Sequence, residues 1–252
     1  MCRMQRGYGE VMEPIWILGF FAAVLVGFTK TGVPGVGILV VPLMAQVFPA
    51  KLSVGAVLPM VIVADVFAVG YYRRHAQWNH LVRLLPSVLV GMAPGWWVLS
   101  KIGNEQLKPA LGGLVLAMVM LELVRKKWKW EKVPRKWWFA PLAGMLAGFA
   151  TTVGNAAGPI MGIYLLSVGL DKKEFMGTAA WYFMIINWVK VPVFASAGVM
   201  TAETLRFDLL AVPMIVVGAV AGILLLPKIP QGLFNVLVLL LAAAAAVYLI
   251  LV

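Results

Sequence analysis

The sequence predicts an all-α integral membrane protein made of two inverted-topology repeats, and three observations lead to this prediction. Of its 252 residues, 62% are hydrophobic and only 12% are charged, whereas a soluble domain carries about 25% charged residues. The apolar residues gather into long segments that short polar loops separate. Similar glycine-containing stretches recur in the same order in the two halves of the chain.

The apolar segments predict eight to ten helices. Their expected ranges are 14–29, 33–48, 52–72, 81–100, 108–124, 138–153, 156–170, 174–199, 208–227 and 232–252. About 20 residues are needed to cross the hydrocarbon core of a bilayer, so the opening pair of segments in each half is short. Each pair is therefore either a hairpin or two short helices that meet at a break. Three transmembrane helices follow it in each repeat.

Two glycine-rich breaks separate the members of these pairs. The stretch at 27–37 reads Gly-Phe-Thr-Lys-Thr-Gly-Val-Pro-Gly-Val-Gly, and the stretch at 148–159 reads Gly-Phe-Ala-Thr-Thr-Val-Gly-Asn-Ala-Ala-Gly-Pro. Glycine permits backbone conformations that other residues avoid, and proline lacks an N–H donor, so neither stretch predicts a continuous helix. Irregular backbone in a membrane is tolerated only where protein or a water-filled cavity satisfies it. Matched breaks in two halves indicate the substrate site of a transporter.

The duplication extends beyond the breaks. The matching positions, in chain order, are Gly27 with Gly148, Thr31 with Thr152, Gly55 with Gly177, Asp65 with Asn187, Gly91 with Gly218 and Gly95 with Gly222. The last two pairs have the spacing that lets helices approach closely, and we interpret them as packing positions. The chain is predicted to divide into a tail at 1–13, a first transmembrane repeat at 14–125, a basic linker at 126–137 and a second repeat at 138–252.

The distribution of basic residues predicts the orientation. Lys and Arg concentrate in the linker, which the positive-inside rule places in the cytoplasm. If each short pair contributes an even number of crossings, each repeat crosses an odd number of times and the repeats are inverted, with both termini on the outer side. A single crossing by each pair would make the repeats parallel, which fits the positions of Lys172 and Lys173 less well.

The composition also excludes several classes of function. One Cys and two His are too few for a disulfide framework or a metal centre, and no motif of a nucleophile or of a phosphate-binding loop is present. The chain is therefore not expected to be an enzyme or to need a cofactor. The net charge of +11 lies mostly in short loops of a membrane protein, so it does not indicate nucleic-acid binding. Membrane lipid is an expected partner, and a homodimer is compatible with the sequence.

Lys30 is the first candidate for a functional site, because charged residues at membrane depth are costly and usually functional. It lies at the first break with Thr29, Thr31 and Gly32, and the N-termini of broken helices attract anions. These four residues are predicted to bind an anionic substrate. The alternative is that Lys30 lies at the tip of a short loop and extends to the lipid headgroups.

Asp65 is the only acidic residue well inside a predicted segment, and it matches Asn187 of the second half. Lys190 lies one turn after Asn187 on the same helical face. A two-fold arrangement of the halves would bring Asp65 near Lys190. Asn187 and Lys190 are predicted to bind the anion, and Asp65 to take up a coupling proton. The alternative is a permanent buried ion pair that orients the helices.

The second break supplies uncharged donors. Thr151, Thr152 and Asn155 carry hydroxyl and amide groups suited to the oxygen atoms of an oxyanion, and they are predicted to bind the substrate. Helix capping is an equally good explanation of these residues.

With these residues the chain resembles the TauE/SafE sulfite exporter family. The resemblance rests on the glycine-broken opening of both halves, on the stretch at 27–35 with its following Val-Pro-Leu, and on Gly-Asn-Ala-Ala-Gly-Pro at 154–159. It covers nearly the whole chain. It implies a secondary carrier that exports sulfite or organosulfonates across a prokaryotic inner membrane. Lys-Thr-Gly at 30–32 stands where many relatives have a run of glycines, so the resemblance favours an anion more than sulfite in particular.

The leading hypothesis is thus a multi-pass carrier in the inner membrane for a small sulfur-containing oxyanion, driven by a proton or sodium gradient. Two alternatives are a passive anion channel, whose transport would not depend on a gradient, and a membrane scaffold without a substrate. The polar residues at matched depths of the two halves argue against a scaffold.

Overall fold

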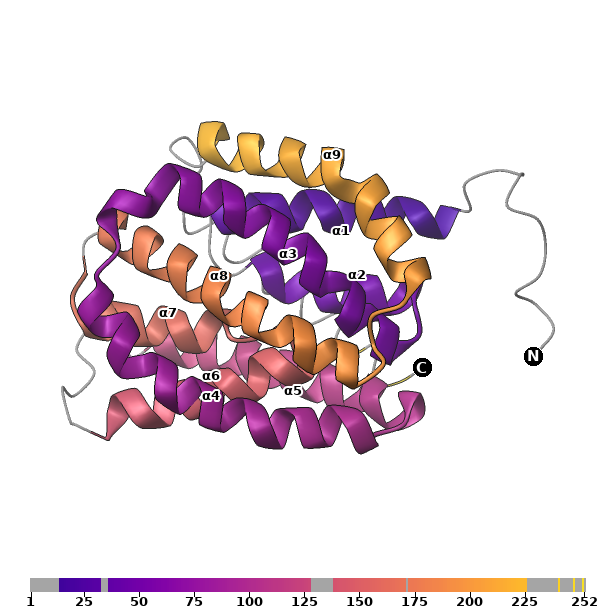
Figure 1. Ribbon diagram of the computed structural model, residues 1–252, viewed down its shortest axis with the longest axis horizontal. Coiled ribbons are helices and arrows are strands. Elements are labelled where there is room, and N and C mark those ends of the chain that lie inside the picture. Colours follow the sequence, from indigo (N-terminus) through magenta and orange to yellow (C-terminus); the bar gives the residue numbers. More distant parts are fainter. Residues whose placement is uncertain are drawn as a thin grey trace.

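The computed structural model describes residues 14–32, 36–127, 138–170 and 172–225, together with Leu240, Val247 and Leu251. The helices of the first half are α1 (Pro14–Thr31), η1 (Val36–Leu39), α2 (Val40–Val47), α3 (Ala50–Tyr72), η2 (Arg73–His75), α4 (Trp78–Lys101) and α5 (Asn104–Lys127). Those of the second half are α6 (Phe139–Gly154), α7 (Gly158–Ser167), α8 (Lys172–Ser196) and α9 (Ala202–Leu225). Figure 1 shows that the α-helices lie along the long axis of the molecule and pack side by side.

The predicted all-α class is confirmed for the described residues. The predicted tail at 1–13, most of the linker at 126–137, and almost all of the last segment at 232–252 lie outside them. The helices Ala50–His75, Trp78–Lys101, Lys173–Ser196 and Ala202–Leu224 are long and apolar enough to cross a membrane. The chain is therefore an integral membrane protein.

Both breaks fall where the glycine-rich stretches predict them. α1 ends at Thr31 and α6 ends at Gly154, although residues 33–35 of the first break lie outside the described residues. Gly19 near the start of α1 lies close to Val47 at the end of α2, so these two helices form an antiparallel hairpin. The hairpin interpretation therefore holds in the first half.

The second break has the same form. The ring of Phe139 at the start of α6 stacks on that of Tyr164 in α7, with 6.3 Å between the ring centroids, so α7 also returns along the helix before it. α2 and α7 contain 8 and 10 residues, fewer than the roughly 20 that one crossing needs.

α1 and α9, which are far apart in the sequence, run parallel and in contact. Gly19 lies against Phe207 at one end of the crossing, and Gly32 lies against Gly222 at the other. In Figure 1 the two helices lie next to each other at the top of the molecule. The predicted packing role of Gly222 is confirmed, because a side chain there would meet the backbone of α1.

α4 and α6 are paired in the same way. Gly144 lies against Leu84, and Gly95 lies against Thr152, so these helices also run parallel. α3 and α8 instead run antiparallel, because Gly177 near the start of α8 lies against the last residue of α3, Tyr72.

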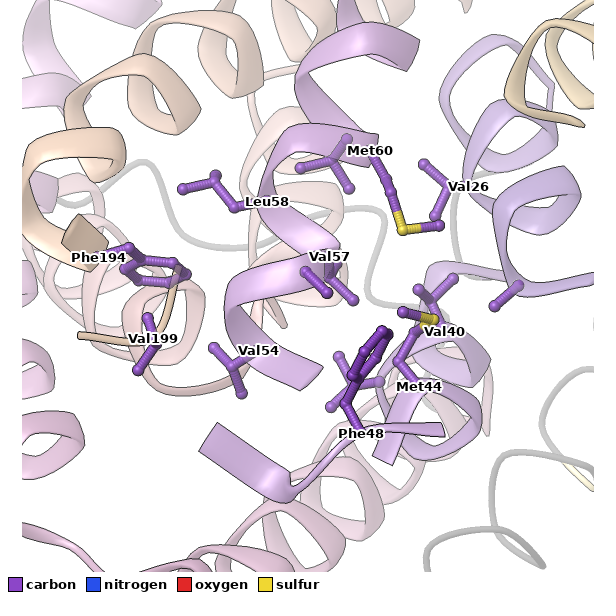
Figure 2. Packing of buried hydrophobic residues seen from close by; sticks show 14 of the residues in the cluster. Val26, Val40, Met44, Phe48, Val54, Val57, Leu58, Met60, Phe194 and Val199 are labelled. Carbon is purple, nitrogen blue, oxygen red and sulfur yellow. The ribbon is translucent and has the colours of Figure 1, made fainter. Parts of the chain in front are cut away.

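α3 is the central helix. Within its most apolar window 67% of the residues are buried inside the protein, against 39% or less for the other three membrane-crossing helices. Figure 2 shows its apolar side chains facing those of neighbouring elements, with Met60 extending toward Val26 of α1 and Val57 near Val40 of α2. A polar group on α3 therefore lies deep inside the protein, where it needs a partner from another helix.

Replacing Gly148 by Ala should destabilise the protein, because the added methyl group would collide with the carbonyl oxygen of Val88. We expect a loss of about 1–3 kcal/mol, measured as a lower unfolding temperature of the purified protein. Gly70→Ala is the matched control, since nothing lies within 4 Å of its added methyl group. Equal unfolding temperatures for the two variants would contradict the close contact.

Candidate functional site

Asp65 lies at the centre of the molecule and joins three helices. Its carboxylate, with an exposed fraction of 0%, forms an ion pair of 2.8 Å with the ammonium group of Lys30. The side-chain amide of Asn187 donates a hydrogen bond of 2.6 Å to the other oxygen. A buried charge is stable only when it is paired and hydrogen-bonded, so these contacts tie α3 to α1 and to α8.

Lys30 lies in the last turn of α1, where a positive charge also interacts favourably with the helix dipole. Its ammonium group lies 3.9 Å from the centre of the ring of Phe183, and only 13% of its side chain is exposed. The alternative in which Lys30 extends to the lipid headgroups is therefore wrong. The next helical segment begins at Val36, and Gly37 in its first turn donates to the hydroxyl of Thr29 beside Lys30. Both Lys30 and Gly37 line the same cavity.

Lys190 is fully buried and contacts the second break. Its ammonium group donates hydrogen bonds of 2.6 Å to the side-chain oxygen of Asn155 and of 3.0 Å to the hydroxyl of Thr151. The expected proximity of Asp65 and Lys190 is confirmed, because their charges interact across the site. The direct ion pair of Asp65, however, is with Lys30. The cause is that Lys30 lies at the end of α1 and reaches α3 directly.

Asn155 holds the second break in place. Its φ angle of 53° lies in the left-handed region, which Asn adopts more easily than most residues. Its backbone N–H caps α6 by bonding to Thr151, and its side-chain amide donates to the carbonyl oxygen of Val54 at 3.0 Å. The capping interpretation therefore holds for its backbone, while its side chain links α3, α6 and α8.

The first break is held by Tyr72. Its hydroxyl donates a hydrogen bond of 3.0 Å to the carbonyl oxygen of Thr31, one of the carbonyl groups that the end of α1 leaves without a helical partner. A side chain of α3 thus satisfies a carbonyl group at the end of α1, as irregular backbone inside a membrane requires.

A central cavity of about 110 Å³ lies between the two breaks. It is lined by residues of both halves, contributed by α1, η1, α2, α3, α6, α7 and α8. Among the predicted site residues it is lined by Thr29, Lys30, Thr151, Asn155, Asn187 and Lys190. Gly158, the first residue of α7, also lines it, so the N-terminus of one broken helix faces the cavity.

Three residues that were predicted to bind the substrate, Thr31, Gly32 and Thr152, are not among those that line the central cavity. The hydroxyl of Thr31 donates to the carbonyl oxygen of Ala219 in α9 at 2.8 Å, and that of Thr152 donates to Gly148 within α6 at 2.8 Å. Gly32 packs against α9. These three residues lie at helix–helix contacts.

Two residues that the structure brings to attention were not predicted from the sequence. Phe183, which lies over Lys30 and lines the cavity, stands four residues before Asn187, a spacing that places both on one helical face. Asp208 lies inside α9 rather than at its start, is 5% exposed and has no hydrogen-bond partner for either carboxylate oxygen among the described residues. Asp65 is therefore not the only acidic residue inside a span.

The polar groups at the cavity are mainly hydrogen-bond donors. Among the described residues no group of three His, Cys, Asp or Glu side chains is placed to hold a metal ion. The polar groups that line the cavity are two ammonium groups, one of them paired with the Asp65 carboxylate, and hydroxyl and amide groups. They offer hydrogen-bond donors to an oxyanion.

Removing one partner of the ion pair should be more harmful than removing both. Lys30→Met leaves Asp65 as a buried unpaired charge, and Asp65→Asn leaves Lys30, so each variant should lose about 3–5 kcal/mol of stability. The double variant should lose clearly less than the sum. The measurement is a double-mutant cycle of unfolding in lipid nanodiscs, and strictly additive losses would contradict the pairing.

The model of the sulfite exporter TauE/SafE family matches residues 18–249. No curated protein and no solved structure matches the chain.

Proposed function

Because the chain belongs to the TauE/SafE sulfite exporter family, we propose that it is a secondary active transporter that carries a small sulfur-containing oxyanion out of the cytoplasm. The substrate, sulfite or an organosulfonate, would bind in the central cavity. The observation that carries this proposal is the position of two lysines at a central cavity between two broken helix pairs. Such breaks near the middle of the membrane are the usual location of a carrier's substrate site.

Lys190 is the strongest candidate for the anion contact. It is buried, and its hydrogen bonds in the described part of the chain go to the neutral oxygen atoms of Thr151 and Asn155. An ammonium group without a carboxylate partner is costly at membrane depth. A bound anion would supply the missing negative charge.

The other cavity-lining polar residues complete the proposed site. Lys30 would add a second positive charge, and Thr29, Thr151, Asn155 and Asn187 would donate hydrogen bonds to the oxygen atoms of the anion. We leave Thr31, Gly32 and Thr152 out of the site, because their contacts are made with neighbouring helices or within their own helix.

Two inverted repeats, at 14–125 and 138–252, belong to the same proposal. Reciprocal packing supports them: the first helix of each half runs parallel to a long helix of the other half, α1 with α9 and α6 with α4. The matched helices α3 and α8 cross antiparallel. A two-fold axis in the membrane plane would exchange these contacts pairwise.

Asp65 is the proposed coupling residue. Its carboxylate lies in the pair that joins Lys30 to α3 and near the cavity that would hold the anion. Protonation of Asp65 would release Lys30 to the anion, so that substrate and proton binding depend on each other. Coupling to sodium is the competing proposal, and a passive channel would need neither ion.

Substitution of Lys190 should weaken anion binding. We expect sulfite or methanesulfonate to raise the unfolding temperature of the unmodified protein, since a ligand that binds only the folded state stabilises it. Lys190→Met should weaken this binding by at least about tenfold, because a charge-assisted contact is lost. Lys101→Met, at an exposed position on α4, is the control. Equal stabilisation of all three proteins would contradict the assignment of the site.

Substitution of Asp65 should separate transport from the gradient. In liposomes, we expect the unmodified protein to accumulate the anion only when a proton gradient is imposed. The variant Lys30→Met/Asp65→Asn, which leaves no unpaired charge, should lose this dependence. Accumulation by the variant that still follows the proton gradient would leave Asp65 a purely structural role. Dependence of the unmodified protein on sodium alone would favour the competing ion.

A further inference from the structure

Asp208 is a buried acidic residue that the proposed transport does not use. It lies in the second turn of α9 and is 5% exposed, and among the described residues neither of its carboxylate oxygens has a hydrogen-bond partner. The carboxylate of Asp65, in contrast, has an ion pair and a hydrogen bond. A buried carboxyl group that lacks such partners is stable only in its neutral form.

The surroundings of Asp208 on its own helix are apolar. Phe207, the residue before it, packs against three aromatic rings of α1 and of the end of α2. Ala211, about one turn later, is fully buried in the same apolar cluster as Phe207. Thr204, one turn earlier on the same face, donates its hydroxyl to the carbonyl oxygen of Thr201. The neighbouring side chains of α9 therefore offer no donor to the carboxyl group.

Asp208 also lacks a cationic partner. α9 packs mainly against α1 and α3. The titratable residues of these two helices are Lys30, Lys51, Asp65, Tyr71 and Tyr72. In the part of the chain that the structure describes, none of them forms an ion pair or a hydrogen bond with Asp208. On α9 itself, Glu203 and Arg206 are exposed. An ionised Asp208 would thus be an unpaired charge inside the protein, which is costly at membrane depth.

The matched position of the first half has an apolar residue. Counted back from the matched pairs Gly91–Gly218 and Gly95–Gly222, Asp208 corresponds to Leu81. Leu81 is fully buried in an apolar cluster. Because a leucine fills the corresponding position, packing alone does not require a carboxyl group there, and ionisable residues inside membrane helices are usually functional.

Asp208 lies away from the central cavity. It is not among the residues that line this cavity. Gly222, farther along α9, lies against Gly32 at the end of α1, two residues after Lys30. Asp208 and Gly222 are about 21 Å apart along the helix axis, at a rise of about 1.5 Å per residue. A proton on Asp208 is therefore distinct from one that Asp65 would exchange.

We propose that Asp208 is a second proton-binding site, which holds a proton in the described conformation and which is separate from the central cavity. Binding converts the carboxylate and one proton from water into a neutral carboxylic acid, which the apolar contacts of α9 can enclose. In release, the O–H bond breaks, the proton passes to a water molecule and the charged carboxylate remains. Since the enclosed position offers no partner for that charge, release favours a conformation in which water reaches the start of α9. The packing of α9 thereby depends on pH, whichever anion the protein carries.

Infrared spectroscopy tests the bound proton, because a carboxylic acid and a carboxylate absorb at different frequencies. The carboxyl groups to be isotope-labelled are those of the three aspartates, Asp65, Asp171 and Asp208. At pH of about 7, we expect a carboxylic-acid band from the unmodified protein in lipid nanodiscs. The variant Lys30→Met/Asp65→Asn should retain this band, and Asp208→Asn should lose it. Absence of the band from the unmodified protein, or an undiminished band in Asp208→Asn, would overturn the proposal. If Asp208→Asn does not fold, Asp208→Leu, which has the side chain of the matched position, takes its place.

The pH dependence of unfolding gives a second readout. An aspartate in the unfolded chain loses its proton above a pH of about 4, whereas the enclosed Asp208 keeps it. The folded state then binds one proton more than the unfolded state, so stability falls as the pH rises. Relative to Asp208→Asn, the folding equilibrium constant of the unmodified protein should fall by about tenfold per pH unit from about pH 5 to about pH 7. Glu203→Gln, at an exposed acid of α9, is the matched control and should keep the unmodified slope. Equal slopes for the unmodified protein and Asp208→Asn would contradict the bound proton.

Anion binding distinguishes this site from the proposed transport site. The affinity of Asp208→Asn for sulfite, measured by thermal shift, should stay within about twofold of the unmodified value. A loss of sulfite binding in this variant alone would overturn the separation of the two sites. If sulfite and methanesulfonate bound to neither protein, the proposed transport would fail, while the infrared band would still decide the proton site.

Discussion

The ion pair between Lys30 and Asp65 is the interaction on which the rest of the site depends. Two charges inside a protein this apolar are stable only because each satisfies the other and because Asn187 bonds the remaining carboxylate oxygen. The pair fixes the end of α1 against the central helix α3, and the amide joins α8 to them.

The breaks impose the second constraint, since a helix that ends inside a membrane leaves backbone groups that lipid cannot satisfy. At each break a side chain makes a hydrogen bond to the backbone of another helix. Tyr72 takes the carbonyl group of Thr31, and Asn155 both caps α6 and bonds to Val54. Asn155 also accepts a hydrogen bond from Lys190. The residue that stabilises the second break therefore also positions the Lys190 ammonium group at the cavity.

The sequence predicted the all-α membrane class, the two helix breaks and the glycines at helix contacts. These features depend on local properties, namely the backbone freedom of glycine, the missing N–H of proline and the length of the apolar segments. It also identified six residues that line the cavity. It did not predict the partner of Asp65, which depends on where α1 ends in space. The sequence also assigned Lys30 and Thr31 to the same binding site, although only Lys30 lines the cavity and Thr31 bonds to α9. Adjacent residues on a helix point about 100° apart, so the two side chains face different neighbours. Phe183 was missed because a phenylalanine in an apolar helix carries no signal until the lysine over it is known.

The glycine contacts between α1 and α9, and between α4 and α6, have a mechanical consequence. At the closest contacts, Gly27 against Ile215 and Gly148 against Val88, backbone lies directly on backbone. No side chain at these points could rearrange to let one helix slide along the other. Each pair should therefore behave as a single rigid block that joins one half of the chain to the other. In the transport proposed above, the two blocks would move relative to each other at the α3–α8 crossing, where Asn187 bonds to Asp65.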